Sequence, residues 1–377
     1  MTTSTFQNAL QMTDQWVSES AVKGVAAAIW HRGEIVAGYQ VGDARPHVPV
    51  RVDTLFALAS VSKPFTAATV MRLVVRGDLS LDTPVSAIVP EFEETDDPFA
   101  GDAYPQLEAL RDRITLRMLL SHTSGLPENA GVKRIQMRDQ PTLAHMLDAM
   151  CGVPLQEIPG TTLRYSNVGP AVAARAAERA TGIDFHRLLD DEVLAPRGLT
   201  NVVGRPHDAL DNRIAWVEDP ASPGTPTESY NSPYWRGLGI PWGGYYGTAH
   251  DVVRFAASFI PGHVEHLDEN AAAEMISDQL HGIPGGVDSA SVRWDPAFWG
   301  LGWEVKGTKQ AHWTGTLTSP RTFCHWGQSG TLVWADPDRE LALAVFGNRS
   351  VIKRAWPLVP PRWSNLSDEV VRIADAL

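Results

Sequence analysis

The hydrophobic pattern predicts strands near both ends of the chain. Apolar runs at Val25–Trp30 and Glu34–Gln40 flank His31-Arg32-Gly33, which predicts two strands joined by a turn. Near the other end, Phe323–Gly330 is followed by Thr331–Phe346, with the pattern of two short strands joined at a polar turn. We therefore expect His325 and Gly327 at the start of an inner strand.

Apolar positions at helical spacing mark two other segments. Residues 1–20 are polar overall and predict an amphipathic helix whose apolar face is Phe6, Leu10, Met12, Trp16 and Val17. After residue 60 a second apolar stripe predicts a helix that ends near Gly77, and its members are Phe65, Ala68, Val70, Met71, Val74 and Val75. Pro64 suits the first turn of this helix, where its missing N–H costs nothing.

Ser60-Val61-Ser62-Lys63 places a hydroxyl and an amine three residues apart at the start of that helix. Positions i and i+3 share one face of a helix, so Lys63 can take the proton of the Ser60 hydroxyl. The same spacing recurs at Ser20–Lys23 and Ser350–Lys353, so the pattern alone proves little. Its place at a helix N-terminus distinguishes the first match, because free N–H groups there stabilise a developing anion.

Two further motifs follow in chain order. The only Tyr-x-Asn in the sequence is Tyr165-Ser166-Asn167, and His325-Trp326-Gly327 forms a His-x-Gly near the C-terminus. Tyr165 could also be an ordinary half-buried tyrosine, and the second His-x-Gly, at His31, is expected to be a turn.

Ser-x-x-Lys, then Tyr-x-Asn, then His-x-Gly resembles the serine β-lactamase and penicillin-binding-protein superfamily, nearest to its class C branch with the family VIII carboxylesterases. Other segments typical of that branch support the resemblance, which covers about residues 20 to 350. They are Gly77–Val85, Ile114–Pro127, Gly243–Asp251 and Trp299–Glu304.

The resemblance implies an α+β fold, β-lactamase-like, with an antiparallel sheet flanked by helices plus a mostly helical lobe. Residues 1–61 together with 246–377 would form the sheet lobe, with strands near 25–42 and 300–347 and a C-terminal helix at Leu366–Ala376. Residues 62–245 would form the helical lobe, with a loop insertion at Asp96–Gln106. Ser60 would then lie where the two lobes meet.

The resemblance also implies the roles of the site residues. Ser60 would be the nucleophile, Lys63 its base, and Tyr165 a proton shuttle, with the backbone N–H groups of Ser60 and Gln328 receiving the oxyanion. Other residues expected to line the substrate site are Asn167, Trp242, Tyr245, His325, Trp326 and Gly327. Ser121–Gly125, by contrast, is explained by a structural turn.

His325 departs from the pattern of many β-lactamases and transpeptidases, in which a lysine at this position helps hold a substrate carboxylate. A neutral histidine keeps a hydrogen bond but gives up the fixed charge, which favours esters or amides over carboxylated β-lactams.

Eleven of the thirteen tryptophans lie after position 200. The segment Tyr230–Trp242 is too turn-rich for a core strand or helix, and an aromatic loop there would wall a pocket for a bulky, apolar or aromatic acyl group.

Composition is that of a globular enzyme, with 44% hydrophobic and 20% charged residues in 377. The net charge of −12 argues against nucleic acid and anionic membranes as partners. No signal peptide and no membrane-spanning run are visible, and two cysteines, Cys151 and Cys324, predict no disulfide, so we expect a cytoplasmic protein. Cys324 is expected to be a small buried residue and not a nucleophile. No metal or cofactor is expected.

The sequence therefore predicts a serine hydrolase that acts on small esters or amides through a covalent acyl-enzyme, most simply a carboxylesterase. An acyltransferase with the same Ser-Lys-Tyr site is the alternative. A D-aminopeptidase, a weak β-lactamase and a non-catalytic binding module are further alternatives, and the intact motif residues argue against the last.

Overall fold

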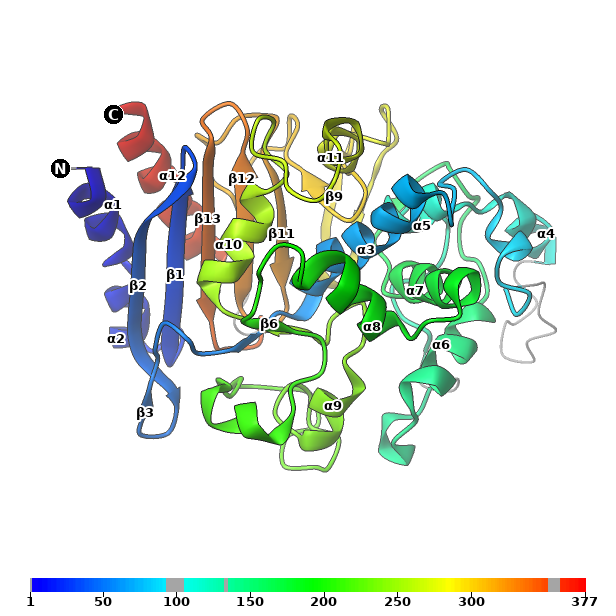
Figure 1. Ribbon diagram of the computed structural model, residues 1–377, viewed down its shortest axis with the longest axis horizontal. Coiled ribbons are helices and arrows are strands. Elements are labelled where there is room, and N and C mark those ends of the chain that lie inside the picture. The colour runs from blue at the N-terminus through cyan, green and yellow to red at the C-terminus, as the bar shows by residue number, and fades with distance from the viewer. Residues whose placement is uncertain (1, 93–104, 132–134, 352–359) are drawn as a thin grey trace.

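The central sheet is built from both ends of the chain. The structure is a computed structural model that describes residues 2–92, 105–131, 135–351 and 360–377. Seven antiparallel strands lie in the order β10-β11-β12-β13-β1-β2-β3 (Figure 1). Their bounds are β1 Gly24–His31, β2 Glu34–Arg45, β3 Val48–Pro49, β10 Glu304–Val305, β11 Phe323–Gly327, β12 Thr331–Asp336 and β13 Leu341–Gly347. Because β1 pairs with β13, with Ala28 opposite Ala344, the two ends of the chain share one core.

The C-terminal strands differ from the sequence prediction. Two strands were expected in this region, but the structure has three, because the turn after Gly327 separates β11 from β12. Gly330 makes this turn possible with a φ of 100°, and its N–H donates to Gly327 O at 3.0 Å. β11 is an inner strand as expected, but His325 lies in its middle and Gly327 ends it, so the expectation that both lie at the start of the strand is wrong.

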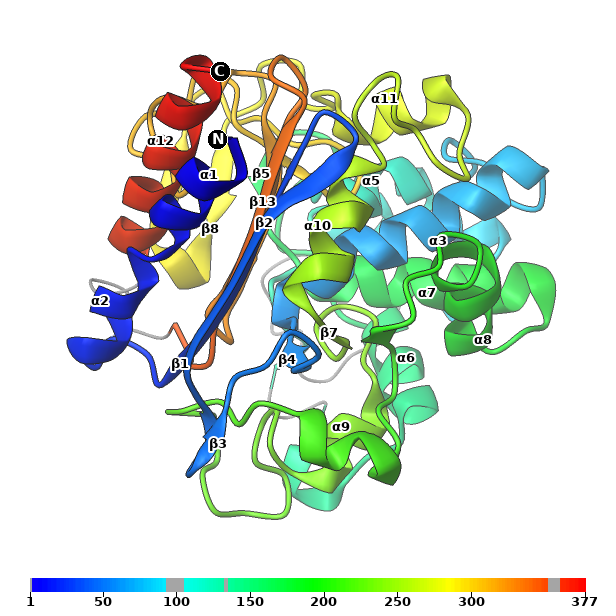
Figure 2. The ribbon, with the colours of Figure 1, turned by 60° about the vertical axis from the view of Figure 1, so that its left-hand side comes forward.

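Helices cover both faces of the sheet. Figure 2 shows α1 (Thr2–Leu10), α2 (Thr13–Ser18) and α12 (Pro360–Asp375) on one face and α10 (Ala249–Ala257) on the other. The N-terminal segment forms two helices and not one, because the Thr13 hydroxyl donates to Leu10 O at 2.7 Å and ends the first. Phe6, Trp16 and Trp363 are buried beneath the three helices, so the expected apolar face is directed into the core.

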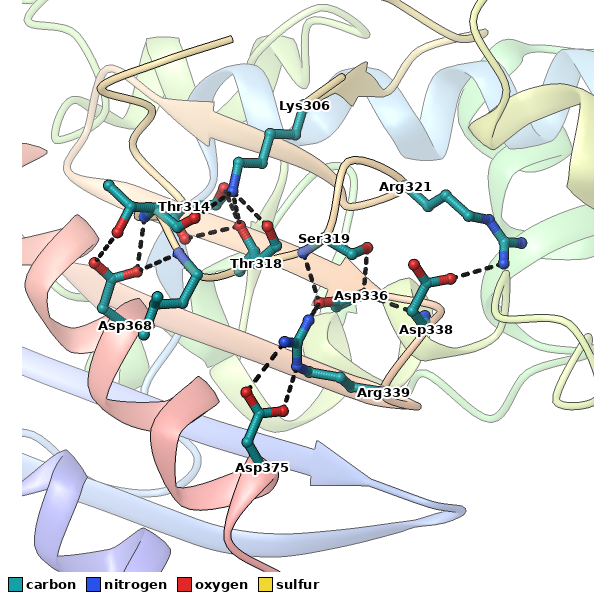
Figure 3. Close-up of polar contacts among 12 residues, drawn as sticks. Lys306, Thr314, Thr318, Ser319, Arg321, Asp336, Asp338, Arg339, Asp368 and Asp375 are labelled. Carbon is teal, nitrogen blue, oxygen red and sulfur yellow. Dashed lines mark hydrogen bonds and ion pairs between the residues drawn. The ribbon is translucent and has the colours of Figure 1, made fainter. Parts of the chain in front are cut away.

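Polar contacts fix α12 to the strands beneath it (Figure 3). The Asp368 carboxylate accepts hydrogen bonds from the backbone N–H groups of Thr316 and Leu317, at 2.7 and 2.9 Å. At the last residue of the helix, the Asp375 carboxylate accepts a hydrogen bond from Arg339 of the β12–β13 turn at 2.7 Å. The Asp368 contacts hold the long β10–β11 connection against α12, and the Asp375 contact holds the β12–β13 turn.

The remaining helices gather on one side of the sheet (Figure 1). They are α3 (Ser62–Arg76), α4 (Pro105–Glu108), α5 (Leu116–Leu120), α6 (Leu143–Cys151), α7 (Val168–Thr181), α8 (Phe185–Leu189), α9 (Pro233–Leu238) and α11 (Glu269–Ile276). The helix predicted after residue 60 is α3, which packs against α7 and α8 and ends at Gly77 with a φ of 88°. Of the insertion expected at Asp96–Gln106, only Pro105 and Gln106 lie within the described residues, at the start of α4.

Two small sheets flank the region between strands and helices. One contains β4 (Phe56–Ala57), β7 (Tyr246–Gly247) and β6 (Val202–Val203), and the other contains β5 (Leu163–Arg164), β8 (Gly285–Val287) and β9 (Val292–Trp294). β4 leads directly toward Ser60, and β5 leads directly to Tyr165. Each small sheet therefore positions one of the sequence motifs.

The segment Tyr230–Trp242 is not entirely a loop. Ser232 accepts a hydrogen bond from Trp235 N–H, and Pro233 occupies the first turn, so six residues form the short helix α9. Only Leu238 of this helix is buried, so the segment forms a short helix but no core strand or core helix. Cys151 and Cys324 are both buried free thiols. No helix in the described part of the chain is both long and apolar enough to span a membrane.

Candidate active site

Ser60 lies in a constrained turn that leads into α3. Ala59, immediately before it, has a φ of 47°, a left-handed conformation that is uncommon for alanine. Two neighbours hold the turn: the Thr331 hydroxyl donates to Leu58 O at 3.0 Å, and Leu58 N–H donates to Tyr245 O at 2.8 Å. The Ser60 side chain is half-buried, so its hydroxyl is fixed but not sealed from substrate.

Lys63 is bound at three points. Its Nζ lies 2.9 Å from Ser60 Oγ, 2.7 Å from Asn167 Oδ1 and 2.9 Å from the carbonyl oxygen of Trp242. The side chain is 1% exposed. A neutral amine has two N–H donors and one lone pair. The two oxygen acceptors therefore use both donors and leave the lone pair directed at Ser60.

Burial makes this lysine a base near neutral pH. Desolvation lowers the pKa of Lys63 to about 7, and the negative charge of Glu128 opposes that shift. At pH 7 about half of the molecules would hold an uncharged amine. The group can therefore accept the Ser60 proton without a large energetic penalty.

Tyr165 lies on the other side of Ser60. Burial raises the pKa of its phenol well above the usual 10, while a hydrogen bond with Ser60 opposes the increase. The Lys63 ammonium lies 4.7 Å from the centre of the Tyr165 ring. The structure therefore brings Ser60, Lys63, Tyr165 and Asn167 together as one group, with Tyr165 protonated at neutral pH.

His325 contributes an uncharged ring to the same group. Its Nδ1–H donates to Trp326 O at 2.9 Å, which leaves Nε2 as an acceptor. Burial first, and then the charge of Lys63, lower the pKa of His325 to about 3. Its ring centre lies 6.1 Å from that of Tyr165 and 6.0 Å from that of Trp299. His325 therefore lies beside Tyr165 without a charge.

Gly327 allows the end of β11 to touch the turn that carries Ser60. A Cβ atom at this position would lie 2.2 Å from Leu58 O and 3.1 Å from Ala59 Cβ, so only glycine fits. Gln328 is the next residue, and its side chain is exposed. Neither its backbone N–H nor that of Ser60 has a hydrogen-bond partner within the described residues.

Three of the expected substrate-binding residues occupy other positions. Trp242 contributes its carbonyl oxygen to Lys63, while its side chain is buried. Tyr245 is wrongly placed by the sequence prediction: its side chain is 0% exposed, and its hydroxyl lies 3.1 Å from Thr66 Oγ1 in the core behind α3. Trp326 follows His325 on β11, so its side chain leaves the opposite face and packs on Trp313 at 5.6 Å.

The other two Ser-x-x-Lys matches lie away from this group. Ser20 is in a turn with a φ of 56°, and Lys23 lies 3.8 Å from Glu218 in an ion pair. Ser350 is buried, and Lys353 lies outside the described residues.

Sequence reasoning missed His122 and Trp299. His122 does lie in a turn, as expected for Ser121–Gly125, with a φ of 58°. Its Nδ1 also accepts a hydrogen bond from Ser166 N–H at 3.1 Å, and its ring centre lies 4.6 Å from that of Tyr165. Trp299 packs against both, at 5.0 Å from His122 and 5.7 Å from Tyr165. Both residues stand in segments that carried the family resemblance, which was the only signal.

A second buried polar cluster lies behind these rings. Potential metal-ligand atoms of Glu304, His312 and Cys324 lie within 4.8 Å of one another. However, the Lys309 ammonium lies 2.6 Å from Glu304 Oε1, and burial raises the pKa of the Cys324 thiol well above 9. A carboxylate already bound to an ammonium and a protonated thiol are poor ligands. The cluster is therefore a buried ion pair, and Cys324 is a buried residue as expected.

Comparisons with known proteins agree with this geometry. The chain is 32% identical to Penicillin-binding protein 4 of Amycolatopsis lactamdurans over 266 residues, which cover 68% of this chain and 62% of that protein. It is also 32% identical to Esterase EstB of Burkholderia gladioli over 297 residues, 71% of this chain and 72% of that protein. The crystal structure of a family VIII carboxylesterase matches the fold with a TM-score of 0.80 at 20% identity, over 98% of this chain and 97% of that one.

The family model described as Beta-lactamase matches residues 6–357. This range includes both small sheets, the Ser60 turn and the strand that carries His325. The chain therefore belongs to the beta-lactamase family, whose members related to it include an esterase and a penicillin-binding protein.

Proposed function

We propose that the protein is a serine hydrolase that cleaves small esters or amides through a covalent acyl-enzyme, and most simply a carboxylesterase. The observation that carries this proposal is the environment of Lys63, whose Nζ has two oxygen acceptors and Ser60 Oγ around it at 2.7 to 2.9 Å. A buried lysine that has no carboxylate in contact with it can serve as a base when such hydrogen bonds hold it in place. The likeness to Esterase EstB supports the same class of reaction.

In the first step Lys63 takes the Ser60 proton and Ser60 Oγ attacks the substrate carbonyl. The bond that forms is Oγ–C, and the carbonyl π electrons move to oxygen. Backbone N–H groups of Ser60 and Gln328 would receive this oxyanion, as the close contact of Gly327 with the nucleophile turn favours. Preorganised donors of this kind are worth about 3 kcal/mol each in related chemistry.

In the second step the tetrahedral intermediate collapses and the leaving group departs. Tyr165 donates its phenolic proton to the leaving oxygen or nitrogen, because its raised pKa keeps it protonated at neutral pH. The Lys63 ammonium, 4.7 Å from the ring centre, then returns a proton to Tyr165. Water attacks the acyl-enzyme by the reverse of these transfers and regenerates Ser60.

The electrostatics at His325 favour substrates without a carboxylate at this position. With a pKa of about 3, the ring is uncharged at neutral pH and supplies no ion-pair partner. We further propose that the acyl group is bulky and apolar or aromatic, since Trp235 and Tyr230 pack together at 5.6 Å in the segment that includes α9. Turnover of acetyl esters at the same rate as long or aromatic ones would contradict this part.

The test is the intact mass of the protein after reaction with a fluorophosphonate and with a panel of p-nitrophenyl esters. Wild type should gain one adduct, and Ser60→Ala should gain none and lose at least about 10⁴-fold in turnover. Ser60→Ala protein that is folded and still labelled or active would refute the assignment. Repeating the assay with a competing alcohol or amine separates a hydrolase, which releases the free acid, from an acyltransferase, which releases the new ester or amide.

A further inference from the structure

Glu128 is fixed beside the residue that binds Lys63. Its backbone oxygen accepts a hydrogen bond from Asn167 N–H at 2.8 Å, and its carboxylate Oε2 accepts one from Ser289 N–H at 3.0 Å. The next residue, Asn129, accepts from Asn167 Nδ2 at 2.9 Å. Two consecutive residues therefore bind Asn167, and the Glu128 carboxylate is half-buried at the edge of the catalytic group.

This carboxylate acts on the whole site. Burial has the larger effect on both Lys63 and Tyr165, lowering the pKa of the amine and raising that of the phenol, and the charge of Glu128 acts to raise the pKa of each, so it acts on both sides of Ser60. Within the described residues no cationic side chain forms an ion pair with it. The two neighbouring imidazoles, His122 and His325, do not balance it, because burial lowers the pKa of each below the usual 6.5. When Lys63 is neutral, the described part of the site has a negative charge without a matching cation.

From this arrangement we infer that Glu128 selects substrates that carry a cationic group, such as a primary or quaternary ammonium, near the scissile carbonyl. The inference rests on the proposed function and adds a substrate class to it. An ammonium bound near Glu128 gains Coulomb attraction in a partly dehydrated site, where one carboxylate is worth about tenfold in binding. A carboxylated substrate meets repulsion at the same place.

A purely structural role is the competing explanation, since the carboxylate also anchors the Ser289 backbone. Glu128→Gln separates the two roles, because its amide oxygen still accepts from Ser289 N–H but carries no charge. Glu34→Gln is the matched control. It removes an exposed carboxylate from β2, which lies four strands from β11, about 19 Å across the sheet.

The experiment compares two pairs of esters that differ only in charge. One pair places a trimethylammonium or a tert-butyl group on the acyl chain, as the p-nitrophenyl esters of 4-(trimethylammonio)butanoate and 5,5-dimethylhexanoate. The other places them on the alcohol, as acetylcholine and 3,3-dimethylbutyl acetate. The ratio of kcat/KM within each pair is measured, so any effect of Glu128 on Lys63 cancels.

We expect at least one pair to favour the cation by about tenfold in wild type and in Glu34→Gln, and to lose that preference in Glu128→Gln. Turnover with no charge preference, or a preference unchanged in Glu128→Gln, overturns the inference and leaves the proposed function standing. If folded wild type neither turns over any of the four esters nor is labelled at Ser60 by the fluorophosphonate, the inference and the proposed function are both overturned.

Discussion

Replacing Lys63 by methionine should remove an increase of stability with pH that burial of the amine causes. The pKa of Lys63 is about 7 in the folded protein, against an ordinary value of 10.5. Between these values the unfolded chain binds a proton that the folded protein does not. The free energy of unfolding of wild type should therefore rise as the pH increases from 7 toward 10. Methionine has similar length and no charge, so the variant lacks this contribution.

The magnitude follows from the shift. One pKa unit corresponds to about 1.4 kcal/mol, so charged Lys63 costs the folded state about 5 kcal/mol at low pH. At pH 7 half of the folded molecules already have a neutral Lys63, and between pH 7 and pH 9 the rest lose the proton while the unfolded chain keeps it. About 2 kcal/mol of the cost is therefore removed over this range. Relative to Lys63→Met, wild type should become more stable by that amount over this range.

The assay is urea denaturation of wild type and Lys63→Met at pH 7 and pH 9 at constant ionic strength. Lys23→Met serves as a control, because Lys23 is 57% exposed and lies in a surface ion pair. Its stability difference from wild type should be the same at the two pH values. An equally constant difference for Lys63→Met would refute the reasoning, because Lys63 would then be protonated in the fold at both pH values and could not be the base.

Three other outcomes are expected. With neutral Lys63 as the proposed base, the rate at which a fluorophosphonate labels Ser60 should rise through a pH of about 7 and then level off, and in Glu128→Gln the midpoint should fall, since the charge of Glu128 opposes the lowering of the Lys63 pKa by burial. A rate independent of pH would contradict this. Gly327→Ala should lower kcat by about 100-fold by pushing β11 away from the Ser60 turn. The control Gly237→Ala, whose Cβ would meet nothing within 4 Å, should keep full activity. Equal activity of the two variants would show that the contact between Gly327 and the Ser60 turn is unimportant. Lys309→Met should lower the free energy of unfolding by about 3–5 kcal/mol in thermal or urea unfolding, because it leaves Glu304 buried without its ammonium partner. Adding Glu304→Gln should recover part of the lost stability. No recovery in the double variant would mean that loss of the ion pair does not cause the destabilisation.

The sequence predicted features that depend on residues close together in the chain. The helix that ends at Gly77 and the contact between Lys63 and Ser60 follow from spacing on one helix, and the structure has both. The antiparallel sheet and the family followed from the resemblance and are confirmed. The lobe boundaries at 61/62 and 245/246 stay a prediction, as do the roles of the site residues.

Errors arose where a side chain's direction depends on packing between distant segments. Tyr245 stands in a segment typical of the family, but the segment does not reveal that its ring packs behind α3 on Thr66. Trp326 adjoins His325 in sequence, and the alternation of a strand directs it to the other face, where it packs on Trp313 and beside the cluster that contains Tyr165, so its place in the substrate site stays a prediction. His122 was interpreted as part of a turn only, because its contact with Tyr165 joins two segments that the sequence does not relate.

The same long-range packing determines the chemistry. The pKa of Lys63 is lowered mainly by burial, and its partners come from separate places: Asn167 at the start of α7 and the Trp242 carbonyl after α9. Movement of either segment that admits water to Nζ would return the pKa of the amine toward 10.5 and keep it protonated at neutral pH. Activity should therefore be lost by local opening before the protein unfolds, and the midpoint of inactivation in urea should precede that of global unfolding. Raising the pH to 10 should restore part of the activity in that interval, because the exposed amine then loses its proton, whereas displacement of Ser60 itself would not respond to pH.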